Sequence, residues 1–270
     1  MSATTESLAG EEPSGLGRIA QGVSDTLAVA QRNLIALFRT PQLLVFSTIQ
    51  PVIFVLMFRY VFGGAIQVRG VPYVDFLMPG IFVQTVVFGA TGAAVGLATD
   101  LKSGLLERFR SLPMARSAVL TGRTLADLGR NVFVAILMAS VGYLVGFRIH
   151  GGVPAFLLGM LIVLLFGYVL SWVFASLGLA TGDPESAQAA AFPVIAPLVF
   201  ASSAFVPVDS MPGWLQAWAN NQPVSVVISA VRALVLGLPA TSLVLQALAW
   251  CAGILLVFVP LAVRRYRSVT

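Results

Sequence analysis

Residues that usually carry out chemistry in proteins are few in this chain and lie far apart in the sequence. A phosphate-binding Walker A loop needs Gly-Lys followed by Ser or Thr, and the single lysine, Lys102, follows Leu101 instead. The single histidine, His150, lies beside Arg148 with no carboxylate close to it in the sequence. Cys251 is the single cysteine, which excludes an intrachain disulfide and a multi-cysteine metal site. We therefore expect neither catalytic residues nor metal ligands in this chain.

The composition is that of a membrane protein. Of the 270 residues, 58% are hydrophobic and 10% are charged, whereas soluble domains usually contain about 25% charged residues. A net charge of +5 could suggest a nucleic-acid partner, but the basic residues lie in short loops between apolar runs, so we expect none. Residues 1–22 lack the apolar core of a signal peptide, and we expect a disordered cytoplasmic tail.

Six apolar runs predict membrane-spanning helices, because about 20 apolar residues cross a bilayer. The predicted spans are about 43–62, 76–98, 117–147, 153–180, 188–206 and 243–263. The third is a short apolar run, and we expect Ser117 to cap a helix that begins in the cytoplasm. Before the first span, residues 25–39 form an amphipathic pattern, which predicts a helix in the cytoplasmic interface or, alternatively, an extension of the first span.

Basic residues set the orientation, since cytoplasmic loops collect Lys and Arg. With both termini in the cytoplasm, most of the sixteen basic residues fall on the inner side: Arg18, Arg32, Arg39, Lys102, Arg108, Arg110, Arg116, Arg123, Arg130, Arg264, Arg265 and Arg267. Arg69, Arg148 and Arg232 fall outside, and Arg59 lies within the first span. The sequence therefore predicts that both termini are cytoplasmic.

The inner loop at residues 100–130 begins with a short amphipathic segment. It comprises Leu105, Leu106, Glu107, Arg108, Phe109, Arg110 and Leu112, and it stops at Pro113. Its apolar residues share one helical face. Such a helix fits a groove on a cytoplasmic partner or, alternatively, lies on anionic lipid.

A second unusual segment precedes the last span. Residues 224–237 are apolar, but about 14 residues reach only roughly 20 Å, so the segment lies at the outer interface or enters the bilayer and returns. Ser225, Ser229 and Arg232 form a polar stripe on it at i, i+4 and i+7. The stripe lines the exit of a transport path or lies at the level of the headgroups; both interpretations stay open.

Ionisable groups inside the predicted spans are scarce, although ion-coupled transporters usually require them. Arg59 reaches the outer headgroups or, alternatively, touches an anionic substrate. Asp75 is expected at the outer interface. Gln50 and Gln84 face a central path or form hydrogen bonds between helices. The driving force is therefore expected from another subunit.

Two stretches resemble the ABC-2 type permeases, and within them the branch for daunorubicin and doxorubicin resistance. The inner loop reads LLERFRSLPMARSAVLTGRTLADLGRN. The outer stretch reads PGWLQAWANNQPVSVVISAVRALVLG, with Asn221, Gln222, Pro223, Val224, Arg232 and Gly237 at the places expected for the family. The resemblance implies a coupling helix at 105–112, a second ATPase contact at the N-terminal helix, and a re-entrant outer segment that includes Asn221, Gln222, Pro223, Ser225, Ser229 and Arg232.

These observations together predict an all-α polytopic protein of the bacterial inner membrane, with one transmembrane domain at residues 23–270. The resemblance implies a permease subunit that moves amphipathic drugs or lipids out of the cytoplasm or the inner leaflet. Two copies of a separate ATPase would bind ATP and Mg, leaving this chain without a cofactor, and the second permease would be identical or a paralogue. Alternatives are export of polysaccharide or glycolipid, and a membrane scaffold without transport. A membrane-embedded lipid enzyme is disfavoured, because the spans lack clustered His, Asp or Glu.

Overall fold

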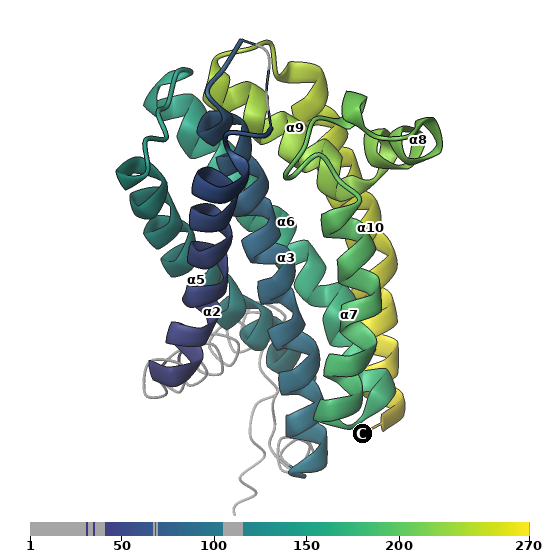
Figure 1. Cartoon of the computed structure of the whole chain (residues 1–270). Coiled ribbons are helices and arrows are strands. Elements are labelled where there is room, and N and C mark those ends of the chain that lie inside the picture. Colours follow the sequence, from purple (N-terminus) through teal and green to yellow (C-terminus); the bar gives the residue numbers. More distant parts are fainter. Residues whose placement is uncertain are drawn as a thin grey trace, which may run out of the picture.

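The computed structural model describes residues 31, 35, 41–66, 68, 70–104 and 116–269. Every regular element in these residues is helical, and the long helices run alongside one another (Figure 1). The elements are α2 (Pro41–Leu56), η1 (Met57–Phe62), α3 (Tyr73–Lys102), α5 (Arg116–Leu144), α6 (Gly152–Thr181), α7 (Pro184–Phe200), η2 (Val208–Ser210), α8 (Gly213–Asn221), α9 (Pro223–Leu236) and α10 (Thr241–Val269). The expected tail at 1–22 and coupling segment at 105–112 lie outside these residues, as does nearly all of the interfacial helix expected at 25–39.

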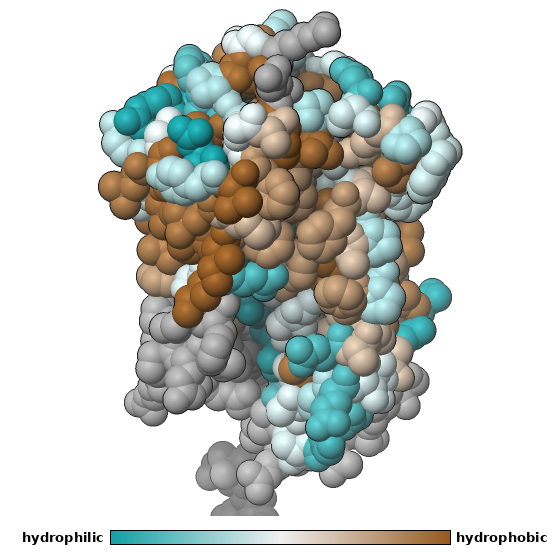
Figure 2. Space-filling view, in the orientation of Figure 1, coloured by the Kyte–Doolittle hydropathy of each residue, from teal (hydrophilic) through white to brown (hydrophobic). Residues whose placement is uncertain are grey.

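Four helices in the described part are long and apolar enough to cross a membrane. They are Tyr73–Lys102, Thr121–Leu144, Gly152–Thr181 and Thr241–Arg267, and the shorter apolar helices are Thr48–Phe62 and Pro223–Leu236. Apolar side chains form a broad zone across the molecule in Figure 2, and hydrophilic side chains concentrate toward its two ends. This distribution fits a bilayer, where every backbone group of a helix is satisfied within the helix itself.

Helix α3 is the centre of the molecule and packs against α5, α6, α7 and α9. Glycines let neighbouring segments of the chain pack closely against α3. A Cβ at Gly80 would lie 2.3 Å from the carbonyl oxygen of Ala204, and one at Gly178 of α6 would lie 2.3 Å from that of Ala94. Small residues at such contacts are the usual means of packing helices in membranes, where lipid supplies no hydrophobic driving force between them.

Two sequence-based details differ from the structure. Arg116 is already helical in α5, so Ser117 lies inside the helix and is not its N-cap. Helix α7 ends at Phe200, although its span was expected to reach residue 206. The cause lies in the turn that follows: the Ser202 hydroxyl donates to the carbonyl of Val199 and accepts from the amide of Ala204. A side chain that replaces backbone partners in this way ends a helix.

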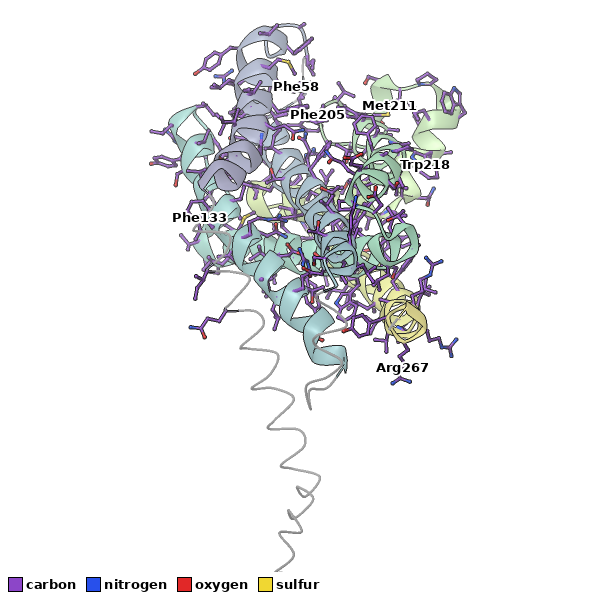
Figure 3. The ribbon with its side chains drawn as sticks, turned by 90° about the horizontal axis from the view of Figure 1, so that it is seen from below. Phe58, Phe133, Phe205, Met211, Trp218 and Arg267 are labelled. Carbon is purple, nitrogen blue, oxygen red and sulfur yellow. The ribbon has the colours of Figure 1, made fainter. Side chains whose placement is uncertain are left out.

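An aromatic cluster joins this turn to the first helical segment. The rings of Phe58, in η1, and Phe205 stack with their centroids 4.4 Å apart, and Figure 3 shows the two residues side by side. Phe54 and Phe200 also contact Phe205, at 5.9 Å each. The cluster fixes the end of α2 and η1 against the turn that follows α7.

Candidate functional site

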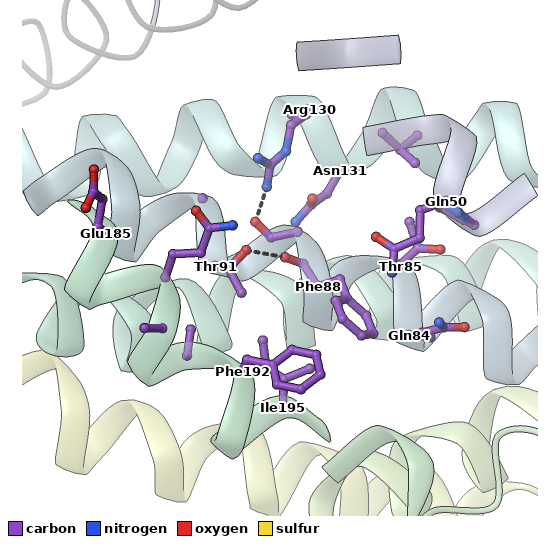
Figure 4. Close-up of a pocket in the computed structure, with 17 residues that line it drawn as sticks. Gln50, Gln84, Thr85, Phe88, Thr91, Arg130, Asn131, Glu185, Phe192 and Ile195 are labelled. Atoms are coloured by element: carbon purple, nitrogen blue, oxygen red, sulfur yellow. Dashed lines mark hydrogen bonds between the residues drawn. The ribbon is translucent and has the colours of Figure 1, made fainter. Parts of the chain in front are cut away.

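A cavity of about 770 Å³ lies between α2, α3, α5 and α7 (Figure 4). The residues that line it are Gln50, Pro51, Gln84, Thr85, Phe88, Gly89, Thr91, Gly92, Arg130, Asn131, Val134, Glu185, Gln188, Ala189, Ala191, Phe192 and Ile195. Figure 4 shows Arg130 and Asn131 entering from α5, opposite Phe192 and Ile195 of α7, with Gln50 and Glu185 toward opposite ends. Its volume is within the range of pockets that bind small organic molecules.

Gln50 and Gln84, which the sequence singled out as path residues, both line this cavity. Gln50 is exposed at its rim. Gln84 is 2% exposed, and none of the described residues donates a hydrogen bond to its Oε1 atom. A buried carbonyl without a partner is costly, so Gln84 is poor evidence for a bond between helices and better evidence for a polar contact inside the cavity.

The two threonines of the cavity wall can only accept a hydrogen bond from a further partner, because each already donates its hydroxyl proton. Thr85 Oγ1 donates to the carbonyl of Ile81 at 2.7 Å, and Thr91 Oγ1 donates to that of Phe88 at 2.7 Å. A hydroxyl has one proton to donate, so each oxygen keeps only lone pairs for another partner. With Gln84 and Glu185, they make the wall rich in hydrogen-bond acceptors.

A charge ladder, defined as Asp100, Arg123, Asp127 and Arg130, joins α3 to α5 beside the cavity. Arg123 Nη1 pairs with Asp100 Oδ2, and the two side chains are 21% and 16% exposed. Arg130 Nη2 lies 3.7 Å from Asp127 Oδ1, with both side chains 14% exposed, and it also donates to the carbonyl of Gly89. Partly buried ion pairs are screened far less than surface pairs.

Glycines of α3 make room for the arginines of the ladder. A Cβ at Gly96 would come 1.3 Å from Arg123 Nη2, and a Cβ at Gly92 would come 2.6 Å from Arg130 Nη1. Each guanidinium therefore lies in a notch that no larger residue could leave open. Arg123 and Arg130 were expected on the cytoplasmic side, where the inner loop at 100–130 meets the third predicted span, and their contact with α3 was not expected.

A signal for the ladder is present in the sequence. Arg123, Asp127 and Arg130 follow i, i+4 and i+7 spacing, so they share one face of α5. Gly89, Gly92 and Gly96 likewise recur at intervals of three and four on α3. Together the two patterns indicate an interface of charges and glycines between the second and third predicted spans.

The polar stripe of α9 faces protein. Arg232 donates from Nε to the carbonyl of Phe76 at 3.0 Å and from Nη2 to that of Ser203 at 2.7 Å. Ser225 Oγ accepts from the amide of Ser203 at 3.1 Å and from Gln222 Nε2 at 3.0 Å. The stripe therefore ties α9 to the beginning of α3 and to the turn after α7.

Other residues of the expected outer segment have local roles. Asn221 is exposed and donates to the carbonyl of Ala217 at 2.8 Å. Gln222 is the N-cap of α9, since its side chain accepts from the amide of Val224 at 3.2 Å. Pro223 occupies the first helical position, and Ser229 is partly buried. These contacts explain where α9 begins.

One sequence-based interpretation at the beginning of α3 needs correction. Asp75, in the first turn of α3, is 1% exposed and accepts from the backbone amide of Arg148 at 2.9 Å. His150 was expected to lack a carboxylate neighbour, but its Nδ1 lies 3.8 Å from Asp75 Oδ2. The two residues are far apart in the sequence, so only the fold brings them together. Arg59 donates from Nε to the carbonyl of Val145 at 3.4 Å, a contact within the protein.

Comparison with known proteins decides the family. The profile of the ABC-2 type transporter family matches residues 24–236. The chain belongs to this family. The daunorubicin resistance ABC transporter permease protein of Streptomyces coeruleorubidus is 37% identical over 260 residues, which cover 96% of this chain and 90% of that protein. A doxorubicin resistance ABC transporter permease protein of Mycobacterium tuberculosis is 30% identical over 209 residues, which cover 73% of this chain and 72% of that protein.

As an ABC-2 permease, the chain is the membrane subunit of an exporter whose ATPase is a separate protein. The residues expected to couple to it, Leu105 to Leu112, lie outside the described residues. They connect α3, which ends at Lys102, to α5, which begins at Arg116. These are the two helices that the charge ladder joins.

An ion pair joins the end of α3 to the beginning of α7. Lys102 Nζ, at the end of α3, lies 2.7 Å from Asp183 Oδ1, directly before α7. Asp183 is also the N-cap of α7, since its Oδ2 accepts from the amide of Ser186 at 3.1 Å. Hydrogen bonds from Lys102 and then from Ser186 lower the pKa of Asp183 to about 2. The carboxylate is therefore ionised throughout the physiological pH range.

Proposed function

We propose that this permease carries amphipathic drugs or lipids through the cavity between α2, α3, α5 and α7. The cavity itself is the observation that supports this most strongly. Its wall combines apolar side chains, among them Phe88, Val134 and Ile195, with a small set of polar groups, a combination typical of sites for amphipathic molecules. Relatives that are named for resistance to daunorubicin or doxorubicin support a drug cargo.

In this proposal the chain crosses the bacterial inner membrane six times. The four long apolar helices are joined by α2 with η1 as the first crossing and by α7 as the fifth, whereas α9 enters from outside and returns. Both termini are cytoplasmic. The C-terminus lies at the same end of the molecule as the end of α3 and the beginning of α7 (Figure 1). Lys102, Arg264, Arg265 and Arg267 are basic residues of these helix ends, and such residues collect on the cytoplasmic side, which supports this orientation.

Coupling to ATP hydrolysis would use the segment at 105–112. Two ATPase copies would bind two permeases, and closure of the ATPases would push this segment. Since a packed interface has discrete arrangements, the push shifts the permease between two states only if contacts differ between them. The charge ladder joins α3 and α5, the two helices that this segment connects in the sequence, and its Arg130 lines the cavity, so it is the structure through which the push would reach Arg130.

Co-reconstitution tests this function. The permease is placed in nanodiscs with the ATPase encoded nearest to its gene, and ATP hydrolysis is measured while daunorubicin or a lipid is titrated. We expect a stable complex and a rise in hydrolysis with one cargo class. A folded permease that binds no ATPase would contradict the proposal and favour a scaffold without transport.

A further inference from the structure

A second hollow lies on the outer surface of the molecule, between α5 and α6, and is separate from the cavity described above. Its volume is about 790 Å³. Ile136, Ala139 and Tyr143 form one side, and Leu157, Leu161 and Leu164 form the other. We call it the lateral groove.

The lateral groove is apolar and open to its surroundings. Ile136, Leu157 and Leu161 are 64%, 60% and 62% exposed. Ser140 also lines it, but its hydroxyl proton is donated to the carbonyl of Ile136 at 3.0 Å. Water would be a poor occupant of such a surface, whereas a hydrocarbon chain would bury it at no polar cost.

A fixed positive charge lies at one end of the lateral groove. The guanidinium carbon of Arg148 lies 4.2 Å from the centre of the Tyr143 ring, which itself lines the groove. Arg148 Nη1 donates to the carbonyls of Tyr143 and Phe147, at 2.9 and 2.8 Å. These contacts hold the guanidinium against Tyr143, one of the residues that line the groove, so little side-chain entropy remains to be lost when a ligand binds.

The guanidinium retains donors for a ligand. An arginine has five N–H groups, and among the described residues none accepts a hydrogen bond from Nε or Nη2 of Arg148. The nearby acid, Asp75, is buried and accepts from the backbone amide of Arg148, and His150 lies beside it. The exposed end of the guanidinium therefore suits a phosphate, which arginine binds with paired hydrogen bonds.

The dimensions fit a lipid. Ile136 and Tyr143 are seven residues apart on α5, which corresponds to roughly 10 Å along the helix. A molecule that fills the lateral groove and reaches Arg148 must therefore carry an extended apolar chain that ends in an anion. We infer that α5 and α6 bind one anionic phospholipid, with an acyl chain in the lateral groove and its phosphate at Arg148. This inference needs the chain to be in a membrane but does not depend on any transport activity.

Lipid retention tests the site. The full-length permease is placed in nanodiscs of equal parts phosphatidylglycerol and phosphatidylcholine, and native mass spectrometry measures which lipid stays bound. We expect enrichment of phosphatidylglycerol, and about a fivefold loss of that enrichment in Arg148→Gln, because one arginine near a membrane surface contributes this much to anionic lipid binding. Arg148→Lys keeps the positive charge but loses the paired hydrogen bonds and the stacking on Tyr143, so it should keep only part of the enrichment.

Controls separate the site from general effects. Arg267→Gln removes an exposed arginine at the far end of α10, which does not line the groove, and should reduce the enrichment much less than Arg148→Gln. Leu161→Trp fills the lateral groove and should reduce retention of both lipids while Arg148 stays in place. Equal retention of the two lipids by the unaltered protein would overturn the inference. So would disulfide formation between two permeases through Leu157→Cys, with Cys251→Ser, because a second copy would then cover the groove.

Discussion

The guanidinium carbon of Arg232 lies 3.7 Å from the centre of the Phe76 ring, and the same guanidinium donates to the backbone carbonyl of Phe76. Arg232 thus contacts both the ring and the backbone carbonyl of Phe76, and it donates a second hydrogen bond to the backbone carbonyl of Ser203. Helices α3 and α9 and the turn after α7 are joined by this single side chain. The beginning of α3 is therefore held to α9 and to the turn after α7 by an arginine that contacts backbone carbonyls.

Replacing Arg232 should loosen that end. Arg232→Ala leaves the carbonyls of Phe76 and Ser203 without their donor, and we expect a loss of about 3 kcal/mol in the free energy of unfolding. Thermal unfolding of the purified permease in detergent measures this. Arg267→Ala is the matched control, since Arg267 is exposed at the end of α10. Equal stability of the two variants would show that the contacts of Arg232 do not stabilise the permease.

The glycine notches make a second prediction. In Gly96→Ala, the new Cβ would displace the Arg123 guanidinium from Asp100, at a cost of about 1–3 kcal/mol in the free energy of unfolding. Gly253→Ala in α10 is the matched control, because no atom lies within 4 Å of a Cβ there and alanine favours the helix by up to about 1 kcal/mol. Unfolding of both variants is measured in the same detergent, and a neutral Gly96→Ala would argue against the notch.

The ion pair of Lys102 and Asp183 predicts a pH dependence. The pKa of Asp183 is lowered from 3.8 to about 2 in the folded protein. Its contribution to stability is therefore present above pH 3.8 and lost as the pH falls toward 2. Between pH 6 and pH 2, the midpoint temperature of thermal unfolding should fall less steeply for Asp183→Asn than for the unaltered protein. Parallel curves would show that the pair has no influence on stability.

The coupling segment predicts a separation of two activities. Replacing Leu106 and Phe109 with Asp removes the apolar face that would fit the ATPase, while the membrane helices are unchanged. We expect ATP hydrolysis that no longer responds to cargo, with normal insertion in the membrane. The control, Leu106→Met with Phe109→Leu, keeps the face apolar and should keep the response. Normal drug-stimulated hydrolysis in the aspartate variant would rule out the assignment.

Local chemistry made some of the fold predictable. The outer segment was expected at 224–237 and is helical at Pro223–Leu236, because a proline at the first position and Gly237, with φ of 72°, define its ends within the sequence itself. Gln50 and Gln84, which both line the cavity, could be singled out because polar residues are conspicuous in apolar runs, and their role in a substrate path stays a prediction.

Other features depend on residues that are distant in the sequence. Arg123 and Arg130 were counted as loop charges, because the glycines that receive them are on another helix. His150 finds Asp75 only after the outer ends of α3 and α5 have come together. The end of α7 at Phe200 is set by the serine turn that follows, which hydropathy does not detect. Sequence patterns thus predicted the elements better than the contacts between them.

The central claim, that cargo contacts the cavity wall, is tested most directly by Gln84→Leu. This change removes a buried carbonyl without a described partner and keeps the size of the side chain similar, so the permease should be as stable as before or more stable. Transport of daunorubicin into proteoliposomes by the permease and its ATPase should fall about tenfold, a loss that corresponds to one hydrogen bond. Gln246→Leu, on the exposed face of α10, should leave both properties unchanged. Unchanged transport with reduced stability in Gln84→Leu would instead mean that Gln84 is a bond between helices, and would contradict the account.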